Sequence, residues 1–452
     1  MSPNDPKREF AVSVVSRLQE AGFRALWAGG CVRDFLLGRA PQDYDVATNA
    51  RPEQVRELFG HRRTHAVGAS FGVILIRGSK EAGDVEVATF RTEGPYLDGR
   101  RPESVAFSSP EEDAQRRDFT INGVFYDPVS QQVHDFVGGE RDLSAAVVRA
   151  IGDPHDRMRE DKLRMLRAVR FAATLEFDLD PVTADAIREM AAEIHLVSAE
   201  RIAQELRKML VDRHRKRAME LACDVKLQPL IFPELAPFLH AAAGTAEAAA
   251  WERTLHMLQL LQQPDFELAA AALLHGVLLH GVLLNGAAGS CDEYGLAAHE
   301  LESRAAHAVT LAATVGRRLK LSNQETERIG WLLAHEYDLA EAPRLPPARL
   351  KRLFANPLSR DLLALVRGET LARNADMQAV VFCEEFLRNT PFEELNPAPL
   401  ITGADLIADG LKPGVRFREL LETVRDAQLN GEINTRDEAL ALVAKLLSDG
   451  GA

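Results

Sequence analysis

The glycine pair Gly29-Gly30 and the segment Asp43-Tyr44-Asp45 constrain the fold of this chain more than any other feature. The glycines follow a short apolar stretch, residues 25–28, and suit the tight turn of a phosphate-binding loop. If the second segment is a strand, alternation sends both carboxylates to one face and Tyr44 to the other. Two carboxylates that face one space repel each other unless a cation lies between them. The pattern therefore predicts an acidic strand beside a glycine turn.

Asp43 and Asp45 are the predicted metal ligands and catalytic residues. Carboxylate oxygens are the ligands that Mg²⁺ prefers, and the ion keeps water or substrate phosphates as its other ligands. Two such ions activate an attacking hydroxyl and stabilise departing pyrophosphate, so the pattern favours metal-dependent nucleotidyl transfer. The alternative is an acidic turn whose side chains cap backbone groups, with the glycines marking a second turn. The ordered spacing favours the catalytic interpretation.

Glu86 is the predicted third acid of the site. It lies in the strand-like segment 85–90 between two valines, which places it opposite to its apolar neighbours. Asp84 points to the same face, so periodicity does not decide between the two acids. An exposed strand edge explains both equally well.

Length and charge bound the class of protein. At about 150 residues per domain, a chain of 452 residues suggests roughly three domains. A composition of 46% hydrophobic and 27% charged residues is that of an ordinary globular protein and excludes a disordered or fibrous chain. The net charge of −13 argues against a uniformly basic nucleic-acid-binding surface, but a local basic face is compatible with it.

Cysteine usage and hydropathy indicate a cytoplasmic protein without a membrane span. The four cysteines have no paired spacing, which favours reduced thiols over a disulfide framework or a zinc cluster: Cys31, Cys223, Cys291 and Cys383. Residues 1–9 are polar and lack the apolar core of a signal peptide. The longest apolar run, residues 268–284, contains histidines and glycines and is shorter than about 20 clean apolar residues.

The order of patterns along the chain predicts an α+β protein. A helix over residues 8–22, a helix over 52–59 and strands over 71–76 and 85–90 indicate a mixed α/β first domain. Residues 91–115 are polar and predict a long loop. Beyond residue 154 the pattern is helical to the end. The predicted domains are a head, a neck, a body and a tail over residues 1–148, 149–235, 236–395 and 396–452.

The segment Arg116-Arg117-Asp118, with Asn122, is a candidate nucleotide-binding element. The planar guanidinium groups donate in pairs to triphosphate oxygens, and Asp118 accepts from a ribose hydroxyl. A surface ion pair at the start of a helix is the alternative.

A helix over residues 160–171 is the candidate base-reading element, with Asp161 and Arg164 as neighbours on its surface. An acid that accepts from an exocyclic amine and an arginine that donates to a ring acceptor together read an edge of cytosine or adenine. An intrahelical salt bridge is the alternative. Arg167 completes the predicted nucleotide-binding set.

A basic run in the second domain is a candidate phosphate-binding stripe for RNA, made by Arg213, Arg215, Lys216 and Arg217. Solvated surface charge is the commoner explanation of such runs. Upstream of it, a helix begins near Glu200, with Ser198 as the expected N-cap.

Taken in order, these segments resemble the class II tRNA nucleotidyltransferase and bacterial poly(A) polymerase family over about residues 10–235. The resemblance implies a nucleotidyltransferase head followed by all-helical neck, body and tail domains. The family's catalytic motif is matched by Gly29, Gly30, Arg33, Asp34, Asp43 and Asp45, and its ribose-selecting motif by Arg116, Arg117, Asp118 and Asn122. Its protein template for the base is matched by Glu160, Asp161 and Arg164, and its support helix by residues 200–206.

The resemblance implies transfer of CMP and AMP from CTP and ATP to the 3′ end of tRNA, with Mg²⁺ as cofactor. Residues 96–102, with Asp98 and Arg100, match the flexible loop of members that add the terminal A. Residues 67–72 match the CCA-adding version of a segment that is basic in poly(A) polymerases. An enzyme that adds only the terminal A, a poly(A) polymerase, and a non-catalytic RNA-binding protein are the alternatives. The oligomeric state stays open.

Residues 250–340 resemble a degraded HD phosphohydrolase-type helical domain. His256 and His275 fall where such domains place metal ligands, but Gly276 stands where an aspartate is needed. The five residues 273–277 are also repeated as 278–282, which disturbs the helix. Hydrolysis here is therefore the least favoured alternative. Residues 401–447 resemble the tail domain of the family.

Overall fold

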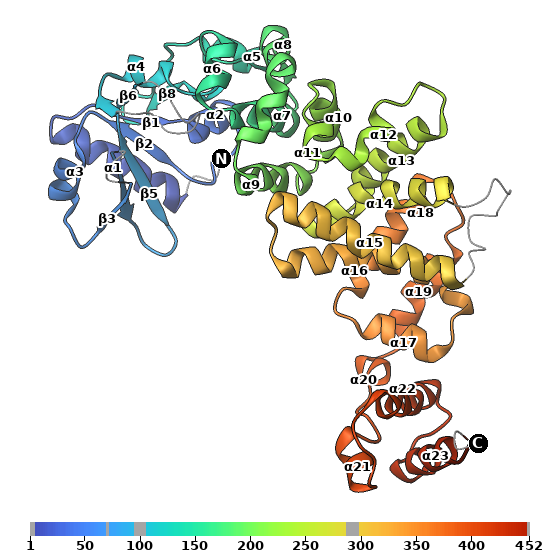
Figure 1. Cartoon of the computed structure of the whole chain (residues 1–452). Coiled ribbons are helices and arrows are strands. Elements are labelled where there is room, and N and C mark those ends of the chain that lie inside the picture. The colour runs from blue at the N-terminus through green and yellow to red at the C-terminus, as the bar shows by residue number, and fades with distance from the viewer. Residues whose placement is uncertain (1–4, 69–71, 95–104, 286–297, 450–452) are drawn as a thin grey trace. The chain divides into compact units, whose positions relative to one another are not determined.

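The computed structural model describes residues 5–68, 72–94, 105–285 and 298–449. By its internal contacts the chain divides into two units, residues 1–233 and 234–452 (Figure 1). Unit 1 contains a mixed sheet with helices, and unit 2 is helical in its described part. The finer division into head, neck, body and tail remains a prediction.

A seven-stranded sheet organises the first half of unit 1, in the order β3-β4-β5-β2-β1-β8-β9 (Figure 1). Strands β2 and β5 are parallel, whereas the other neighbours in this sheet are antiparallel. The strands are β1 (Ala25–Ala28), β2 (Asp45–Thr48), β3 (Thr64–Gly68), β4 (Val73–Arg77), β5 (Asp84–Thr89), β8 (Phe125–Asp127) and β9 (Gln132–His134).

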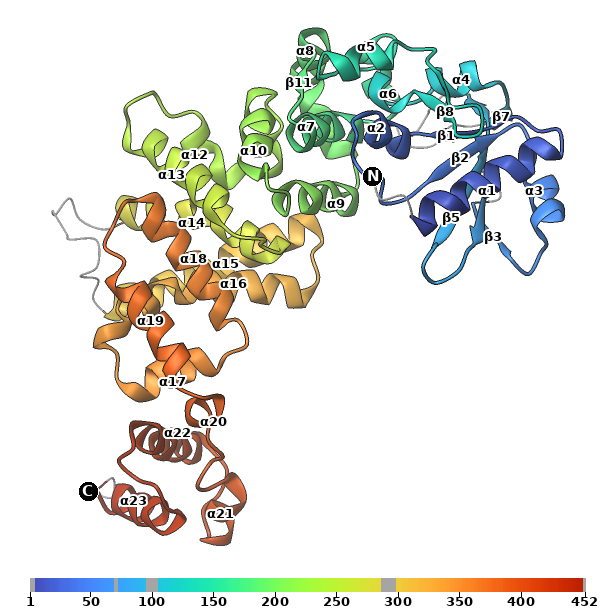
Figure 2. The ribbon, with the colours of Figure 1, turned by 180° about the vertical axis from the view of Figure 1, so that it is seen from behind.

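Helices α1 (Pro6–Glu20) and α3 (Pro52–Phe59) cover one face of this sheet, as Figure 2 shows from behind. The apolar stripe of α1 packs against the alternate strand residues Trp27, Val46 and Val87. The intervening residues Leu26, Ala28 and Ala47 join a separate cluster on the other face. Because side chains alternate along a strand, Asp45 and Glu86 lie on this second face, away from the helical layer.

The structure corrects two expectations for the head. Asp43 is not part of a strand, because β2 begins at Asp45, and Asp43 lies in the bend that leads into it. The region 91–115 is not a continuous loop, since β6 (Arg91–Glu93) pairs with β7 (Val105–Phe107) and is followed by α4 (Pro110–Gln115). Residues 95–104 lie outside the described part.

Short helices complete unit 1 after the sheet. They include η2 (Thr120–Asn122), α5 (Gly139–Ser144), α6 (Pro154–Glu160), α7 (Leu163–Leu175), α8 (Pro181–Met190), α9 (Ala199–Leu210), α10 (Arg215–Asp224) and α11 (Gln228–Ile231). The amphipathic pattern of α7 buries its apolar residues against α9 and α10. Ser198 occupies the N-cap of α9, but its side chain makes no capping hydrogen bond.

Unit 2 begins with a bundle and ends with a small separate core. The bundle contains α12 (Ala236–Leu239), α13 (Ala246–Leu260), α14 (Phe266–Asn285), α15 (Ala298–Leu319), α16 (Asn323–Ala340), α17 (Pro347–Ala355), α18 (Ser359–Ala372) and α19 (Gln378–Asn389). After α20 (Phe392–Leu395), the helices α21 (Gly403–Ala408), α22 (Val415–Asn430) and α23 (Arg436–Asp449) bury Leu406, Val424 and Val443 together. Among the described residues, no helix has the length and apolar character of a membrane span.

Candidate active site

The three predicted catalytic acids line one cavity on the open face of the sheet. Asp43, Asp45 and Glu86 surround a space of about 650 Å³, together with Asp84. Asp45 and Glu86 are direct partners in the parallel register of β2 and β5. Asp84 is instead opposite Arg77 on β4. The register therefore favours Glu86 over Asp84 as the neighbour of Asp45, a choice that periodicity left open.

The carboxylates of Glu86 and Asp43 repel the carboxylate of Asp45. Burial of Asp45 by the surrounding protein and the nearby Glu86 carboxylate raise the pKa of Asp45 to about 6, although Arg117 acts in the opposite direction. The side chain still reaches solvent at the mouth of the cavity. The ionised form of Asp45 is thus destabilised by its surroundings.

Carboxylate chemistry and this electrostatic crowding fit a hard divalent cation. Within the described part of the chain, no three His, Cys, Asp or Glu side chains are close enough to form a ready-made metal site. Such an ion readily keeps waters and substrate phosphates as further ligands, so two acids suffice when a triphosphate supplies the rest. Asp43 and Asp45 are the residues that would hold it.

A second cavity, of about 520 Å³, gathers the predicted nucleotide-binding residues. Its lining includes Phe171 and all ten of the predicted set: Gly29, Gly30, Arg33, Arg116, Arg117, Asp118, Asn122, Asp161, Arg164 and Arg167. Gly29 has a φ of 72°, and a Cβ there would lie 3.2 Å from Nη1 of Arg117. The glycine is therefore needed both for its backbone conformation and for the close approach of this arginine.

Asp113 holds two of these arginines and was missed by the sequence analysis. Its side chain is only 1% exposed. Its Oδ1 accepts from Nε of Arg116 at 2.8 Å, and its Oδ2 accepts from Nη2 of Arg117 at 2.9 Å. Although burial acts to raise it, the pKa of Asp113 is lowered by Arg117 and Arg116. The spacing of three and four residues between an acid and two arginines was a signal that could have found it.

Asp118 is the centre of a buried network. Its Oδ2 accepts from Nε and Nη2 of Arg167 at 2.9 and 2.6 Å, and its Oδ1 accepts from Nδ2 of Asn122 at 3.1 Å. The opposing effect of burial is outweighed by Arg167 and Asn122, and the pKa of Asp118 falls to about 2. Asn122 in turn accepts from Nη1 of Arg33 at 2.9 Å. Asp118 is therefore an anion that holds Arg167 directly and Arg33 through Asn122.

The base-reading element is not one continuous helix. Helix α6 ends at Glu160 and α7 begins at Leu163, so Asp161 lies in the break with extended backbone. Arg164 forms its ion pair with Glu160 rather than with Asp161. The alternative of an intrahelical salt bridge between Asp161 and Arg164 is therefore wrong, and both residues line the same cavity.

The basic run of the neck is only partly exposed. Arg215 is buried, and its Nε donates to the backbone carbonyl of Leu210 at 2.9 Å, so it does not belong to a solvent-facing stripe. Arg213 is exposed and lies 3.6 Å from Glu176, and Lys216 lies 3.7 Å from Glu220. Arg217 donates to the carbonyl of Phe177. Asp98 and Arg100 lie outside the described residues.

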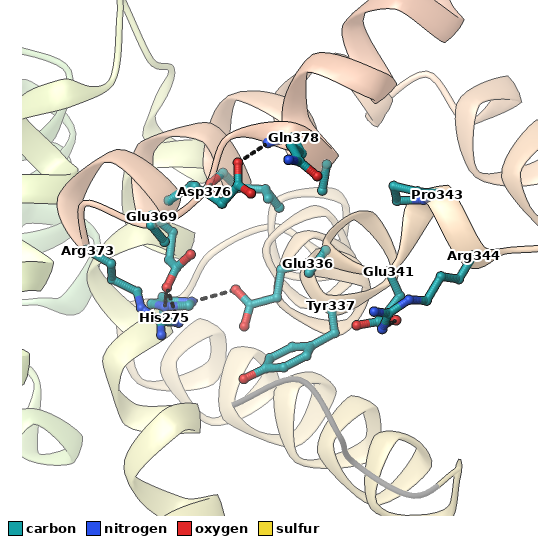
Figure 3. Close-up of a pocket in the computed structure, with 15 residues that line it drawn as sticks. His275, Glu336, Tyr337, Glu341, Pro343, Arg344, Glu369, Arg373, Asp376 and Gln378 are labelled. Carbon is teal, nitrogen blue, oxygen red and sulfur yellow. Dashed lines mark hydrogen bonds and ion pairs between the residues drawn. The ribbon is translucent and has the colours of Figure 1, made fainter. Parts of the chain in front are cut away.

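A third cavity, of about 390 Å³, lies in unit 2 beside His275 (Figure 3). His275 is buried, and its Nδ1 lies 2.6 Å from Oε2 of Glu336, which also pairs with buried Arg304. His256 is exposed on α13 and does not line this cavity. A Cβ at Gly276 would lie 2.8 Å from Oγ1 of Thr254. Figure 3 shows Glu369 on the other side of the imidazole, where Arg373 pairs with it.

The comparisons with known proteins match most of the residues that line the two cavities of unit 1. Residues 25–149 match the family described as "Poly A polymerase head domain", and residues 176–239 match "Probable RNA and SrmB- binding site of polymerase A". The chain is 42% identical over 238 residues to "Poly(A) polymerase I" of Escherichia coli O157:H7, covering 50% of each protein. It is 42% identical over 231 residues to the "CCA-adding enzyme" of Bacillus subtilis strain 168, covering 51% of this chain and 56% of that protein.

The chain is similar to CCA-adding enzymes and bacterial poly(A) polymerases over about half of its length. It spans about half the length of these two curated relatives. A solved structure, "Crystal structure of Bacillus stearothermophilus CCA-adding enzyme in complex with CTP", covers 99% of both chains with a TM-score of 0.71 and 28% identity. The family resemblance thus extends, as a fold, over both units.

Proposed function

We propose that this protein is a tRNA nucleotidyltransferase that uses Mg²⁺ to transfer CMP and AMP from CTP and ATP to the 3′ end of tRNA. The observation that carries the proposal is the pair of adjoining cavities in unit 1. One presents Asp43, Asp45 and Glu86, and the other presents the arginines. Arg117 belongs to the second cavity and influences the charge of Asp45 in the first.

The reaction forms one P–O bond and breaks another. The oxygen of the terminal 3′ hydroxyl attacks the α-phosphorus in line, the hydroxyl loses its proton, and pyrophosphate leaves. Asp43 and Asp45 would hold the divalent cation, which supplies activation of the hydroxyl and stabilisation of the departing charge. Arg116 and Arg117 donate to the triphosphate, and their orientation is set beforehand by Asp113. Positioning and charge stabilisation therefore supply most of the acceleration.

Base choice is assigned to Asp161 and Arg164. A carboxylate accepts from the exocyclic amine that cytosine and adenine share, and a guanidinium donates to their ring acceptors. Arg164 is 8% exposed and is held by Glu160 and by the carbonyl of Arg157, so its donors have a fixed direction. Uracil and guanine offer a carbonyl where the amine would be and leave Asp161 without a donor.

The substrate is tested with defined tRNA ends. Wild-type protein is incubated with Mg²⁺ and labelled CTP or ATP on one tRNA transcript that ends before C74, after CC, or after CCA. We expect incorporation of C on the first, of A on the second, and none on the third. The Asp45→Asn variant is the negative control, and Asp84→Asn is its matched control in the same cavity. Absence of incorporation on the first two ends would contradict the proposal.

A second candidate is a poly(A) polymerase. It is favoured by the identity of 42% to an enzyme named poly(A) polymerase I. The same assay separates the two, because a poly(A) polymerase extends a completed CCA end or an oligo(A) primer by many residues with ATP alone. Addition of A without any C on the shortest tRNA would indicate this activity, whereas A only after CC would indicate an A-adding enzyme.

A further inference from the structure

Phe171 lies at the meeting point of three arginines. The guanidinium carbons of Arg170, Arg33 and Arg167 lie over its ring at 4.0, 5.2 and 5.3 Å from the centroid. A ring of this kind attracts a cation through the negative charge on its face. Three like charges are thereby brought around one side chain, which is an unfavourable arrangement unless something separates and neutralises them.

No single acid neutralises all three arginines, although Glu205 lies within ion-pair distance of both Arg167 and Arg170. Arg33 pairs with Asp34 at 2.8 Å, and Arg167 pairs with Asp118 at 2.6 Å. Arg170 pairs with the buried Glu205. These acids come from separate segments of unit 1, and the ring of Phe171 is the group that all three arginines share.

The ring also has a fixed position. Phe171 is 7% exposed, lies on α7, and packs edge-on against Phe119 with centroids 5.8 Å apart. It lines the cavity that also contains Arg33 and Arg167, whereas Arg170 does not line it. A rigid ring at the floor of the cavity therefore faces the two arginines that a nucleotide would meet.

We propose that Phe171 is a positioning residue, whose ring holds Arg33 and Arg167 apart and directed into the cavity so that both meet the phosphates of the incoming nucleotide. This rests on the proposed function, because it assumes that the cavity binds CTP and ATP. Phe171 itself touches the arginines and not the reacting atoms. Its effect is on nucleotide binding rather than on the chemical step.

The test compares loss of the ring with loss of an equal volume elsewhere in unit 1. Phe171→Leu removes the aromatic face, Phe171→Tyr retains it, and Phe232→Leu removes a buried ring that contacts none of these arginines. For each, the Kd of CTP and ATP is measured by calorimetry with Mg²⁺ and without tRNA, and KM and kcat are measured on tRNA ending in CC. Thermal unfolding confirms that each variant is folded, and Phe171→Met replaces Phe171→Leu if the latter does not fold.

We expect Phe171→Leu to weaken binding of both nucleotides about 5- to 10-fold and to raise the KM for ATP by the same factor. The kcat should stay within about threefold of the wild-type value. Phe171→Tyr is expected to restore binding to within about twofold, and Phe232→Leu to leave it within about twofold. Equal effects of Phe171→Leu and Phe232→Leu, or a failure of Tyr to rescue, would overturn the positioning role. Failure of the wild-type protein to bind either nucleotide would instead contradict the proposed function itself, before any variant is compared.

Discussion

Arg201 on α9 holds Asp161 by a two-point ion pair, with Nη1 donating to Oδ1 at 3.1 Å and Nη2 donating to Oδ2 at 2.6 Å. Oδ1 also accepts from the backbone N–H of Leu163 at 3.1 Å. An ionised carboxylate has about four acceptor positions, so Oδ2 retains one for a base amine. The acid assigned to base choice is thus oriented by a helix other than the one that carries Arg164.

Loss of Arg201 should therefore impair selection. We expect Arg201→Ala to raise misincorporation of UTP or GTP on a tRNA ending before C74 about tenfold, because Asp161 loses its orientation. Arg201→Lys should give an intermediate value, since an ammonium cannot donate in a planar pair. Arg164→Ala should blur the choice between CTP and ATP more than it weakens triphosphate binding. Lys208→Ala, on the same helix α9 as Arg201, is the control for Arg201→Ala. Unchanged fidelity in Arg201→Ala would refute the orienting role.

The acidic cavity predicts opposite effects on activity and stability. Asp43→Ala and Asp45→Asn should each lower incorporation at least about a thousandfold, because the cation loses a ligand. In the absence of metal, Asp45→Asn should nevertheless stabilise the protein at pH 8 by about 1 kcal/mol or less, since exposure to solvent screens the repulsion. Steady-state incorporation and thermal unfolding in EDTA measure the two effects.

The pH dependence of that stabilisation follows from the raised pKa of Asp45, about 6 in the folded protein against 3.8 for the unperturbed group. Between pH 3.8 and about 6 the folded state binds more protons than the unfolded state, so the folded protein loses stability as pH rises through this window. The benefit of Asp45→Asn should therefore disappear below about pH 4. A benefit that is independent of pH would contradict the assigned cause.

The buried Asp113 predicts a joint loss of stability and nucleotide binding. Asp113→Asn retains the shape but not the charge, and leaves Arg116 and Arg117 without their shared anion. Breaking a buried ion pair costs about 3–5 kcal/mol. We expect a lower melting temperature and at least about tenfold weaker CTP binding by calorimetry. Glu111→Gln, an exposed acid on the same helix, should change neither quantity appreciably, and equal effects of the two variants would count against this role.

The buried pair of His275 and Glu336 predicts a pH-dependent stability in unit 2. Burial alone would lower the pKa of His275, but Glu336 outweighs this and raises it. Stabilisation by the protonated imidazole is therefore complete below the unfolded value near 6.5 and is lost as pH rises through the raised folded value. His275→Gln should lower the melting temperature more at pH 6 than at pH 9. The control is His335→Gln, because among the described residues the imidazole of His335 hydrogen-bonds only to the backbone carbonyl of Trp331. Identical losses of melting temperature in His275→Gln at both pH values would exclude the mechanism.

Much of the fold could be predicted from local patterns. The helix expected at residues 52–59 coincides with α3, and the short apolar stretch at 25–28 forms β1, because proline at the first helical position and an apolar run are local signals. The order of the strands could not be predicted, since β2 and β5 pair across a long separation in sequence. The break at Asp161 was also missed, because no glycine or proline marks it and the apolar spacing continues across it.

The candidate site, like the fold, could be predicted only in part. The nucleotide-binding set was predicted from motifs and lies in one cavity, but its supporting residues were not predicted. Arg201 contacts Asp161, and Phe171 contacts Arg33 and Phe119, across long separations in sequence, and such contacts have no periodic signature. Arg215 was placed wrongly because a basic run does not show which of its members turns inward.

The parallel pairing of β2 with β5 has a consequence for the newly made chain. Parallel neighbours cannot be joined by a tight hairpin, so the partner of Asp45 is synthesised only after β3 and β4. A ribosome-bound fragment that stops short of Glu86 contains Asp43 and Asp45 but lacks the third acid of the cavity. The acidic cavity is thereby completed only when β5 has joined the sheet beside β2.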